Sequence, residues 1–260
     1  MLNLLFAGTA TSAARVFAAT LFMALSLASE ASKDAPTPPG SQVRIVLLGD
    51  STVMTYISGP REFYGWGHFL EEELGPGFKV FNHAAAGRSS KSFWNEKRVG
   101  PAMKEKPDIV IVQFGHNDEP GKGEKSETNP NDTYREYLRL YLRAILDAGA
   151  KPVFVTPVVR RIYYSDGRLD NSKLRPYAEA MIAVAKEEKI PCFDLNRESF
   201  RFFEELGSAK SAKMNAGSGG ADFTHFNAEG AKKITAMVAT FLRQDMPEAF
   251  KVPKDAPLAK

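Results

Sequence analysis

Short runs of nearly continuous apolar residues, separated by amphipathic stretches, constrain the fold of this chain most strongly. The candidate strands are residues 43–48 (VRIVLL), 78–82, 108–114 (DIVIVQF), 152–156 and 192–195. Strands that are apolar on both sides are typical of parallel sheets whose two faces are covered, and the intervening helices supply that cover. The pattern predicts a three-layer α/β/α sandwich with a five-stranded, mostly parallel sheet.

The clearest helical pattern covers residues 132–148, where apolar side chains recur at helical spacing. These side chains are Leu138, Tyr141, Leu142 and Ile145. Gly149 follows and is expected to end the helix. Residues 120–131 and 208–220 are rich in glycine, proline and polar residues, so we expect two exposed loops there.

The N-terminus has the pattern of a secretory signal. Arg15 precedes an apolar run over residues 16–27, and the small residues Ala28 and Ala31 offer cleavage positions. An uncleaved membrane anchor is the alternative, but the run is shorter than the roughly 20 apolar residues that a spanning helix needs. We therefore expect residues 1–31 to be removed on export to the periplasm or the exterior, with no stable membrane anchor.

The remaining chain is long enough to bury one substantial core. We expect a linker over residues 32–42, one catalytic domain over 43–245 and a tail over 246–260. The net charge is +3, which is too small to argue for nucleic acid as a partner. Cys192 is the only cysteine, so no intramolecular disulfide can form, and its apolar surroundings favour packing over reactivity.

Polar clusters follow four of the predicted strands, at the point where each strand ends. They are Gly49-Asp50-Ser51, Gly87-Arg88-Ser89, Gly115-His116-Asn117-Asp118 and Thr156-Pro157. Ligands bind such sheets outside the carboxyl ends of the strands, where the strand order reverses. The clusters are therefore expected to meet at one edge of the sheet.

Ser51, His225 and Asp222 form a candidate catalytic triad. A serine hydroxyl is a poor nucleophile until a base takes its proton, and that base needs an acid to orient it. Asp222 precedes His225 by three residues, so both side chains can share one face. Taken singly, Ser51 could be a helix N-cap and His225 a structural residue, but their order and placement favour the triad.

Acyl transfer also needs hydrogen-bond donors for the oxyanion of the tetrahedral intermediate. Three candidates follow the first three strands: the backbone N–H of Ser51, the backbone N–H of Gly87 and the side-chain amide of Asn117. Gly87 has no side chain to obstruct a substrate carbonyl. Adjacent residues after a strand point in different directions, so His116 is not expected to act as the base.

The order of these motifs resembles the SGNH (GDSL-type) hydrolase superfamily, which has a flavodoxin-like fold. More narrowly, the chain resembles the rhamnogalacturonan acetylesterases of carbohydrate esterase family twelve. That likeness rests on residues 49–52 (GDST), 87–93 (GRSSKSF), 114–118 (FGHND), 156–161 (TPVVRR) and 222–225 (DFTH), and it spans roughly residues 43–243. Thr52 stands where leucine is usual in the superfamily, which favours the narrower family.

The resemblance implies a serine esterase with Ser51 as nucleophile, His225 as base and Asp222 as its orienting acid. The implied activity is removal of O-acetyl groups from a plant cell-wall polysaccharide, pectic rhamnogalacturonan first, without metal or cofactor. Other carboxylesterases of the same scaffold, acting on xylan, small acetyl sugars, lipids or thioesters, are alternatives. A catalytically silent carbohydrate-binding protein is a further alternative, which the complete set of site residues disfavours.

Five side chains near these motifs are candidates for substrate binding. Arg88, Arg160 and Arg161 follow predicted strands, and a guanidinium group suits bidentate contact with a uronate carboxylate. Tyr64 and Trp94 could stack on a sugar face, since each combines an apolar ring with a polar edge. The alternatives are surface cations balanced by nearby acids for the arginines, and core packing for the aromatic residues.

Overall fold

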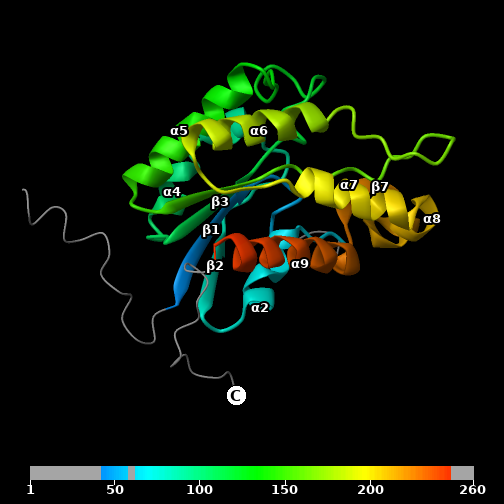
Figure 1. Ribbon diagram of the computed structural model, residues 1–260, viewed down its shortest axis with the longest axis horizontal. Helices are drawn as coiled ribbons and strands as arrows, with labels where there is room; N and C mark the ends of the chain where they lie inside the picture. The colour runs from blue at the N-terminus through cyan, green and yellow to red at the C-terminus, as the bar shows by residue number, and fades with distance from the viewer. Residues whose placement is uncertain (1–41, 58–61, 247–260) are drawn as a thin grey trace, which may run out of the picture. The chain divides into compact units, whose positions relative to one another are not determined.

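Five parallel strands form the central sheet in the order β2-β1-β3-β4-β5 (Figure 1). They are β1 (Val43–Gly49), β2 (Phe78–Asn82), β3 (Ile109–Gln113), β4 (Lys151–Val155) and β5 (Cys192–Phe193). Leu47 of β1 pairs with Asn82 on one side and with Ile111 on the other. This computed structural model confirms the fold class and the parallel sheet predicted from the sequence.

The structure describes residues 42–57 and 62–246, all of which belong to one unit spanning Gly40–Lys260. The predicted signal peptide, nearly all of the predicted linker and nearly all of the predicted tail lie outside the described residues. These three assignments stay predictions. Within the described residues, no helix is both long enough and apolar enough to cross a membrane.

Alternate residues of β1 face opposite cores, which is why the strand is apolar from Ile45 to Leu48. Ile45 and Leu47 pack with one set of helices, whereas Val46 and Leu48 pack with the other. The first set is η1 (Trp66–Phe69), α2 (Leu70–Leu74), α7 (Leu195–Leu206) and α9 (Ala228–Asp245). The second set is α3 (Ser90–Asn95), α4 (Val99–Met103), α5 (Thr133–Asp147) and α6 (Arg175–Glu188). The two sets cover opposite faces of the sheet, which gives the three expected layers (Figure 1).

A small antiparallel pair lies outside this sheet and differs from the sequence prediction. Its strands are β6 (Asn215–Ala216) and β7 (Asp222–Phe226), in a region expected to be loop up to residue 220. Three short helical segments accompany it: α8 (Ser208–Ser211), η2 (Ala212–Met214) and η3 (Ser218–Gly220). A two-residue strand in a glycine-rich segment has no apolar alternation, so sequence periodicity could not indicate it.

The position of the active site follows from the strand order. The chain leaves β1 to form β2 on one side and then returns to form β3 on the other. The segments after β1 and β3 therefore part at the carboxyl edge and leave a crevice between them. Ser51 follows β1 and Asn117 follows β3, so both lie beside this crevice.

Candidate active site

Ser51, His225 and Asp222 form a continuous hydrogen-bonded chain in the folded protein. The Nε2 atom of His225 lies 2.8 Å from the Ser51 hydroxyl, and its Nδ1 atom lies 2.8 Å from an Asp222 carboxylate oxygen. Ser51 comes from the turn after β1, whereas the other two residues come from β7. With Nδ1 protonated, Nε2 is free to accept the serine proton, which is the arrangement that general-base activation needs.

The Asp222 carboxylate is oriented by the backbone that follows it. Its second oxygen accepts hydrogen bonds from the backbone N–H groups of Thr224 and His225, each 2.9 Å long. Burial alone would raise the pKa of Asp222, but the hydrogen bonds from His225 and Thr224 outweigh it and lower the pKa. The carboxylate therefore stays ionised beside the imidazole and can stabilise an imidazolium.

Arg161 holds the backbone of the β6–β7 hairpin from inside the protein. This position corrects the prediction that Arg161 binds substrate. The residue is 2% exposed. Its guanidinium donates to the backbone carbonyls of Asp222, Thr224 and His225 over distances of 2.5 to 3.3 Å. It also donates to Asn215 of β6 at 2.8 Å. A guanidinium whose donors are used in this way cannot reach a substrate carboxylate, so Arg161 positions β7 instead.

A buried chain of polar side chains supports the turn that carries Ser51. The Trp66 indole donates to the side chain of Gln113, and the Gln113 amide donates to the Thr52 hydroxyl at 2.8 Å. That hydroxyl and the Thr52 N–H both donate to one oxygen of Asp50. Thr52 thus links β3 to the turn after β1 through its hydroxyl, which a leucine at this position could not do.

Asp50 also contacts His116 in the buried floor of the site. The second Asp50 oxygen lies 3.5 Å from His116 Nδ1. Burial lowers the pKa of His116, although the nearby charge of Asp50 acts in the opposite direction. Burial would raise the pKa of Asp50, but His116 and the hydrogen bonds from Thr52 outweigh it and lower the pKa. Asp50 precedes Ser51 and His116 precedes Asn117 in the chain. The contact therefore joins the loop of the nucleophile to the loop of an oxyanion donor.

The residues of the three predicted oxyanion donors line one hollow. Among the described residues, no acceptor takes the backbone N–H of Ser51 or of Gly87. The Asn117 amide donates one proton to the Arg88 carbonyl at 3.1 Å and has a second proton to offer. Gly87 has a φ of +74°, a conformation that most residues avoid. These donors can receive the negative oxygen of a tetrahedral intermediate.

Asp118 anchors the loop that carries Asn117 to neighbouring segments of the protein. It is fully buried and accepts hydrogen bonds from the Ser90 N–H, the Ser90 hydroxyl and the Thr128 hydroxyl. Burial raises the pKa of Asp118 to about 7, even though these hydrogen bonds act in the opposite direction. The carboxyl group therefore ties the loop after β3 to the start of α3.

A hollow of about 360 Å³ opens directly above Ser51, and we call it the Ser51 hollow. Its lining residues are Ser51, Tyr56, Phe63, Ala86, Gly87, Asn117 and His225. The Phe63 ring lies 5.5 Å from the His225 ring, and the Tyr56 hydroxyl donates to the Ser51 carbonyl at 3.2 Å. The sequence indicated aromatic residues here but not which of them line the site. Both rings wall a space that suits a small acyl group.

Arg160 and Arg88 are both engaged by protein groups. Arg160 pairs with Glu119 and also donates to the His116 carbonyl and the Thr224 hydroxyl, each at 3.2 Å. It therefore connects the loop after β3 to β7, and its predicted role in substrate binding is not supported by its partners. Arg88 is half-exposed, pairs with Glu96 at 3.1 Å and adjoins Gly87, so its contact with substrate stays a prediction.

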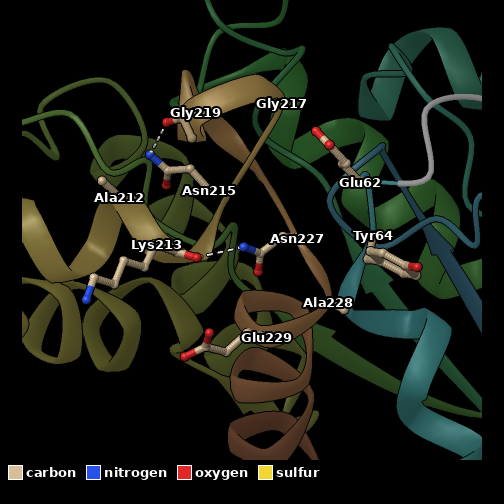
Figure 2. A pocket seen from close by; sticks show the side chains of 11 residues that line it. Glu62, Tyr64, Ala212, Lys213, Asn215, Gly217, Gly219, Asn227, Ala228 and Glu229 are labelled. Atoms are coloured by element: carbon tan, nitrogen blue, oxygen red, sulfur yellow. Dashed lines mark hydrogen bonds between the residues drawn. The ribbon is translucent and has the colours of Figure 1, made fainter.

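The two aromatic residues predicted to bind sugar lie away from the Ser51 hollow. Trp94 packs edge-on against Tyr141, with ring centres 5.4 Å apart, so the structure assigns it a packing role. Tyr64 stacks on Phe69 and lines a separate hollow, seen from close by in Figure 2. Contact between Tyr64 and a longer substrate stays a prediction.

Across residues 42–57 and 62–246, no three His, Cys, Asp or Glu side chains gather in a way that could hold a metal ion. Burial raises the pKa of Cys192 to about 12, and the nearby charge of Asp194 acts in the same direction. A thiol in that state is a poor nucleophile.

Known proteins resemble this chain over most of its length. The probable rhamnogalacturonan acetylesterase YesY of Bacillus subtilis (strain 168) is 37% identical over 203 residues, which covers 77% of this chain and 92% of the relative. The rhamnogalacturonan acetylesterase RhgT of the same strain is 33% identical over 209 residues, covering 76% and 88%. The crystal structure of YxiM from Bacillus subtilis superposes with a TM-score of 0.65 at 25% identity, covering 80% of this chain and 58% of that one.

The family model described as GDSL-like lipase/acylhydrolase matches residues 47–233. That range includes every residue of the hydrogen-bonded chain and all three oxyanion donors. The resemblance predicted from the order of the sequence motifs is thereby confirmed. On both the motif order and the family match, this chain belongs to the GDSL-like lipase/acylhydrolase family.

Proposed function

We propose that this carboxylic ester hydrolase removes O-acetyl groups from a polysaccharide, with pectic rhamnogalacturonan as the foremost substrate. The observation that carries the proposal is the unbroken chain from Ser51 through His225 to Asp222, with both hydrogen bonds 2.8 Å long, beneath a hollow of about 360 Å³. The choice of an acetyl ester and of this polysaccharide rests on the relatives YesY and RhgT, which are named as rhamnogalacturonan acetylesterases.

Acylation begins when the Ser51 hydroxyl attacks the ester carbonyl while His225 Nε2 takes its proton. The carbonyl oxygen becomes an oxyanion that accepts hydrogen bonds from Ser51 N–H, Gly87 N–H and the Asn117 amide. When the intermediate collapses, His225 returns the proton to the departing sugar oxygen, and the acetyl group stays on Ser51.

Deacylation repeats these steps with water as the nucleophile. His225 takes a proton from the water, the new oxyanion uses the same donors, and collapse releases acetate and restores the Ser51 hydroxyl. Asp222 orients the imidazole and stabilises its charged form in both halves of the cycle. Because an acetyl group is small, the Tyr56 and Phe63 rings can enclose it without moving.

The cellular location belongs to the same proposal. The apolar run over residues 16–27, preceded by Arg15 and followed by small residues, supports export to the periplasm or the exterior. An exported enzyme would meet its polysaccharide outside the cytoplasm. Comparing the N-terminal residue of the protein purified from cell extract and from the exported fraction would test the cleavage.

The test of the catalytic proposal is acetate release from a small activated acetyl ester by the purified protein and by its Ser51→Ala variant. We expect turnover by the wild type and a loss of at least about 10³-fold in the variant. Equal activity in both proteins would refute the role of Ser51. Rates on butanoyl and octanoyl esters then separate an acetylesterase, which should reject them, from a lipase.

The polysaccharide is tested in the same assay. Acetate release from acetylated rhamnogalacturonan, acetylated xylan and short acetylated sugars should be fastest with the first. A preference for xylan would keep the esterase mechanism and overturn the pectic assignment.

A further inference from the structure

Three segments carry the catalytic groups, and two of the three contacts between them are direct. The turn after β1 contacts β7 through the hydrogen bond between Ser51 and His225. It contacts the loop after β3, residues 114–119, through the side chains of Asp50 and His116. We call this loop the oxyanion loop. Among the described residues, no hydrogen bond or ion pair joins the oxyanion loop directly to β7, so any polar link between them comes from elsewhere in the chain.

Arg160 supplies this link through all three nitrogen atoms of its guanidinium group. Nη2 donates to the His116 carbonyl and Nε donates to the Thr224 hydroxyl, each over 3.2 Å. Nη1 pairs with the Glu119 carboxylate. The side chains of Arg160 and Glu119 are 12% and 6% exposed, so solvent screens their attraction much less than that of a surface ion pair. Arg160 therefore ties two residues of the oxyanion loop to one residue of β7.

The bonded neighbours of Arg160 adjoin two groups that take part in the reaction. His116 directly precedes Asn117, an oxyanion donor, and Thr224 directly precedes His225, the base. A shift of either segment relative to Arg160 would change the distance between the donor and the base. Misplacement of a reacting group by about 1 Å can lower a rate by about 10²-fold.

The backbone that carries Arg160 is itself held in place on both sides. Val159 is fully buried, and its N–H donates to the Ser199 hydroxyl of α7 at 3.1 Å. The Arg161 N–H donates to the Phe223 carbonyl of β7 at 2.9 Å. The Arg160 side chain thus extends from a fixed backbone, which is what a group needs if it is to fix the position of others.

We propose that Arg160 is a positioning residue for ester hydrolysis, which holds the oxyanion donor Asn117 and the base His225 in register with each other. Arg160 does not line the Ser51 hollow, so it acts through its neighbours and not through contact with the reacting ester. Glu119 contributes by fixing the guanidinium group. This inference rests on the proposed esterase mechanism and adds a residue that the mechanism requires.

The first test measures kcat and KM of Arg160→Ala on a small activated acetyl ester, which lacks the sugar chain through which a substrate could contact Arg160. We expect kcat to fall by about 10²-fold with KM nearly unchanged, because the loss falls on the transition state. The matched control is Arg139→Ala, which breaks an ion pair with Glu187 between α5 and α6 and should keep the wild-type kcat. A loss seen only with polysaccharide substrates would mean that Arg160 binds sugar, and the proposal would be wrong.

A double-mutant cycle tests whether Arg160 acts through Asn117. If the arginine places this oxyanion donor, its loss matters less once the donor is gone. The fall in kcat for Arg160→Ala/Asn117→Ala should therefore be clearly smaller than the product of the two single falls. A role in stability alone would make the two losses multiply. Losses that multiply, or a wild-type kcat in Arg160→Ala, would overturn the proposal.

Thr224→Val is a milder variant that leaves the buried ion pair intact. It removes the hydroxyl that accepts from Arg160 Nε and keeps the pair with Glu119. We expect kcat, measured far below the urea transition, to fall by about tenfold in protein that is still folded. An unchanged kcat would show that β7 does not depend on this link, against the proposal. Failure of the wild type to hydrolyse the small acetyl ester would instead overturn the proposed function, so the two failures can be told apart.

Discussion

The turn that carries Ser51 follows β1, an interior strand of the sheet, whereas the hairpin that carries Asp222 and His225 lies outside that sheet. The Ser51 turn is fixed by backbone pairing of β1 on both sides and by the buried chain through Thr52 and Gln113. The hairpin has a two-residue partner strand and one isolated bridge from Tyr64 to Phe226, and the guanidinium of Arg161 holds three of its carbonyl groups.

Substitutions in the two regions should therefore affect different properties of the enzyme. Loss of one donor beside Ser51 should change the reaction rate without loosening the fold, because the sheet still holds the turn. Loss of the cation beneath the hairpin should affect stability and rate together, because it leaves three buried carbonyl groups without their donor.

Arg161→Met is expected to have the largest effect. The variant keeps much of the side-chain volume but removes every hydrogen bond to Asp222, Thr224, His225 and Asn215. We expect the free energy of unfolding to fall by about 3–5 kcal/mol and kcat to fall with it. Urea denaturation followed by tryptophan fluorescence, with kcat measured below the transition, checks both quantities.

Arg161→Lys separates the charge from the geometry. A single ammonium group keeps the charge but cannot reach all four acceptors, so this variant should recover only part of the stability. If Arg161→Met unfolded at the urea concentration of the wild type, the contrast between the hairpin and the Ser51 turn would be wrong.

Asn117→Ala should affect the rate alone. Its amide is one of three oxyanion donors, and removing such a donor typically costs about 2.7–4 kcal/mol of transition-state stabilisation. We therefore expect kcat to fall by about 10²–10³-fold with little change in KM or in the urea midpoint. An equal loss of stability would show that the loop after β3 depends on Asn117 for its fold, and the two regions would then not differ in the way described.

The sequence was sufficient to predict the sheet because each strand carries its own signal. Residues 43–48 and 78–82 are mostly apolar, and the observed strands match them to within one residue. The β6–β7 pair carried no comparable signal, since β6 is two residues long and glycines separate it from β7. Its formation depends on contacts with Arg161, which are distant in the chain.

The residues of the site likewise fall into those that the sequence indicated and those that it did not. Ser51, Asn117, Asp222 and His225 could be proposed because each belongs to a local motif at the end of a predicted element. The role of Arg161 could not be proposed, because the sequence does not tell whether a guanidinium after a strand turns toward solvent or into the core. The choice of Phe63 over Tyr64 as a wall of the Ser51 hollow likewise depends on side-chain direction, which the folded hairpin determines.

The smallest expected effect is that of Asp118→Asn on the way stability depends on pH. The pKa of Asp118 is raised by burial from 3.8 to about 7 in the folded protein. Between these values the folded protein keeps a proton that the unfolded chain has released, so stability is greatest below about pH 4 and declines as pH rises toward 7. Removing the titrating group should flatten this decline.

Urea midpoints at pH 4.5, 5.5, 6.5 and 7.5 measure that slope for both proteins. Thr128→Val is the matched control, because it removes one hydrogen bond to the carboxyl group and keeps the group itself. The control should lose some stability at every pH while keeping the slope of the wild type. A slope that survives in Asp118→Asn would mean that the anchor beneath Asn117 does not titrate in this range, and that the Ser51 side of the site is held equally well at every pH where the enzyme works.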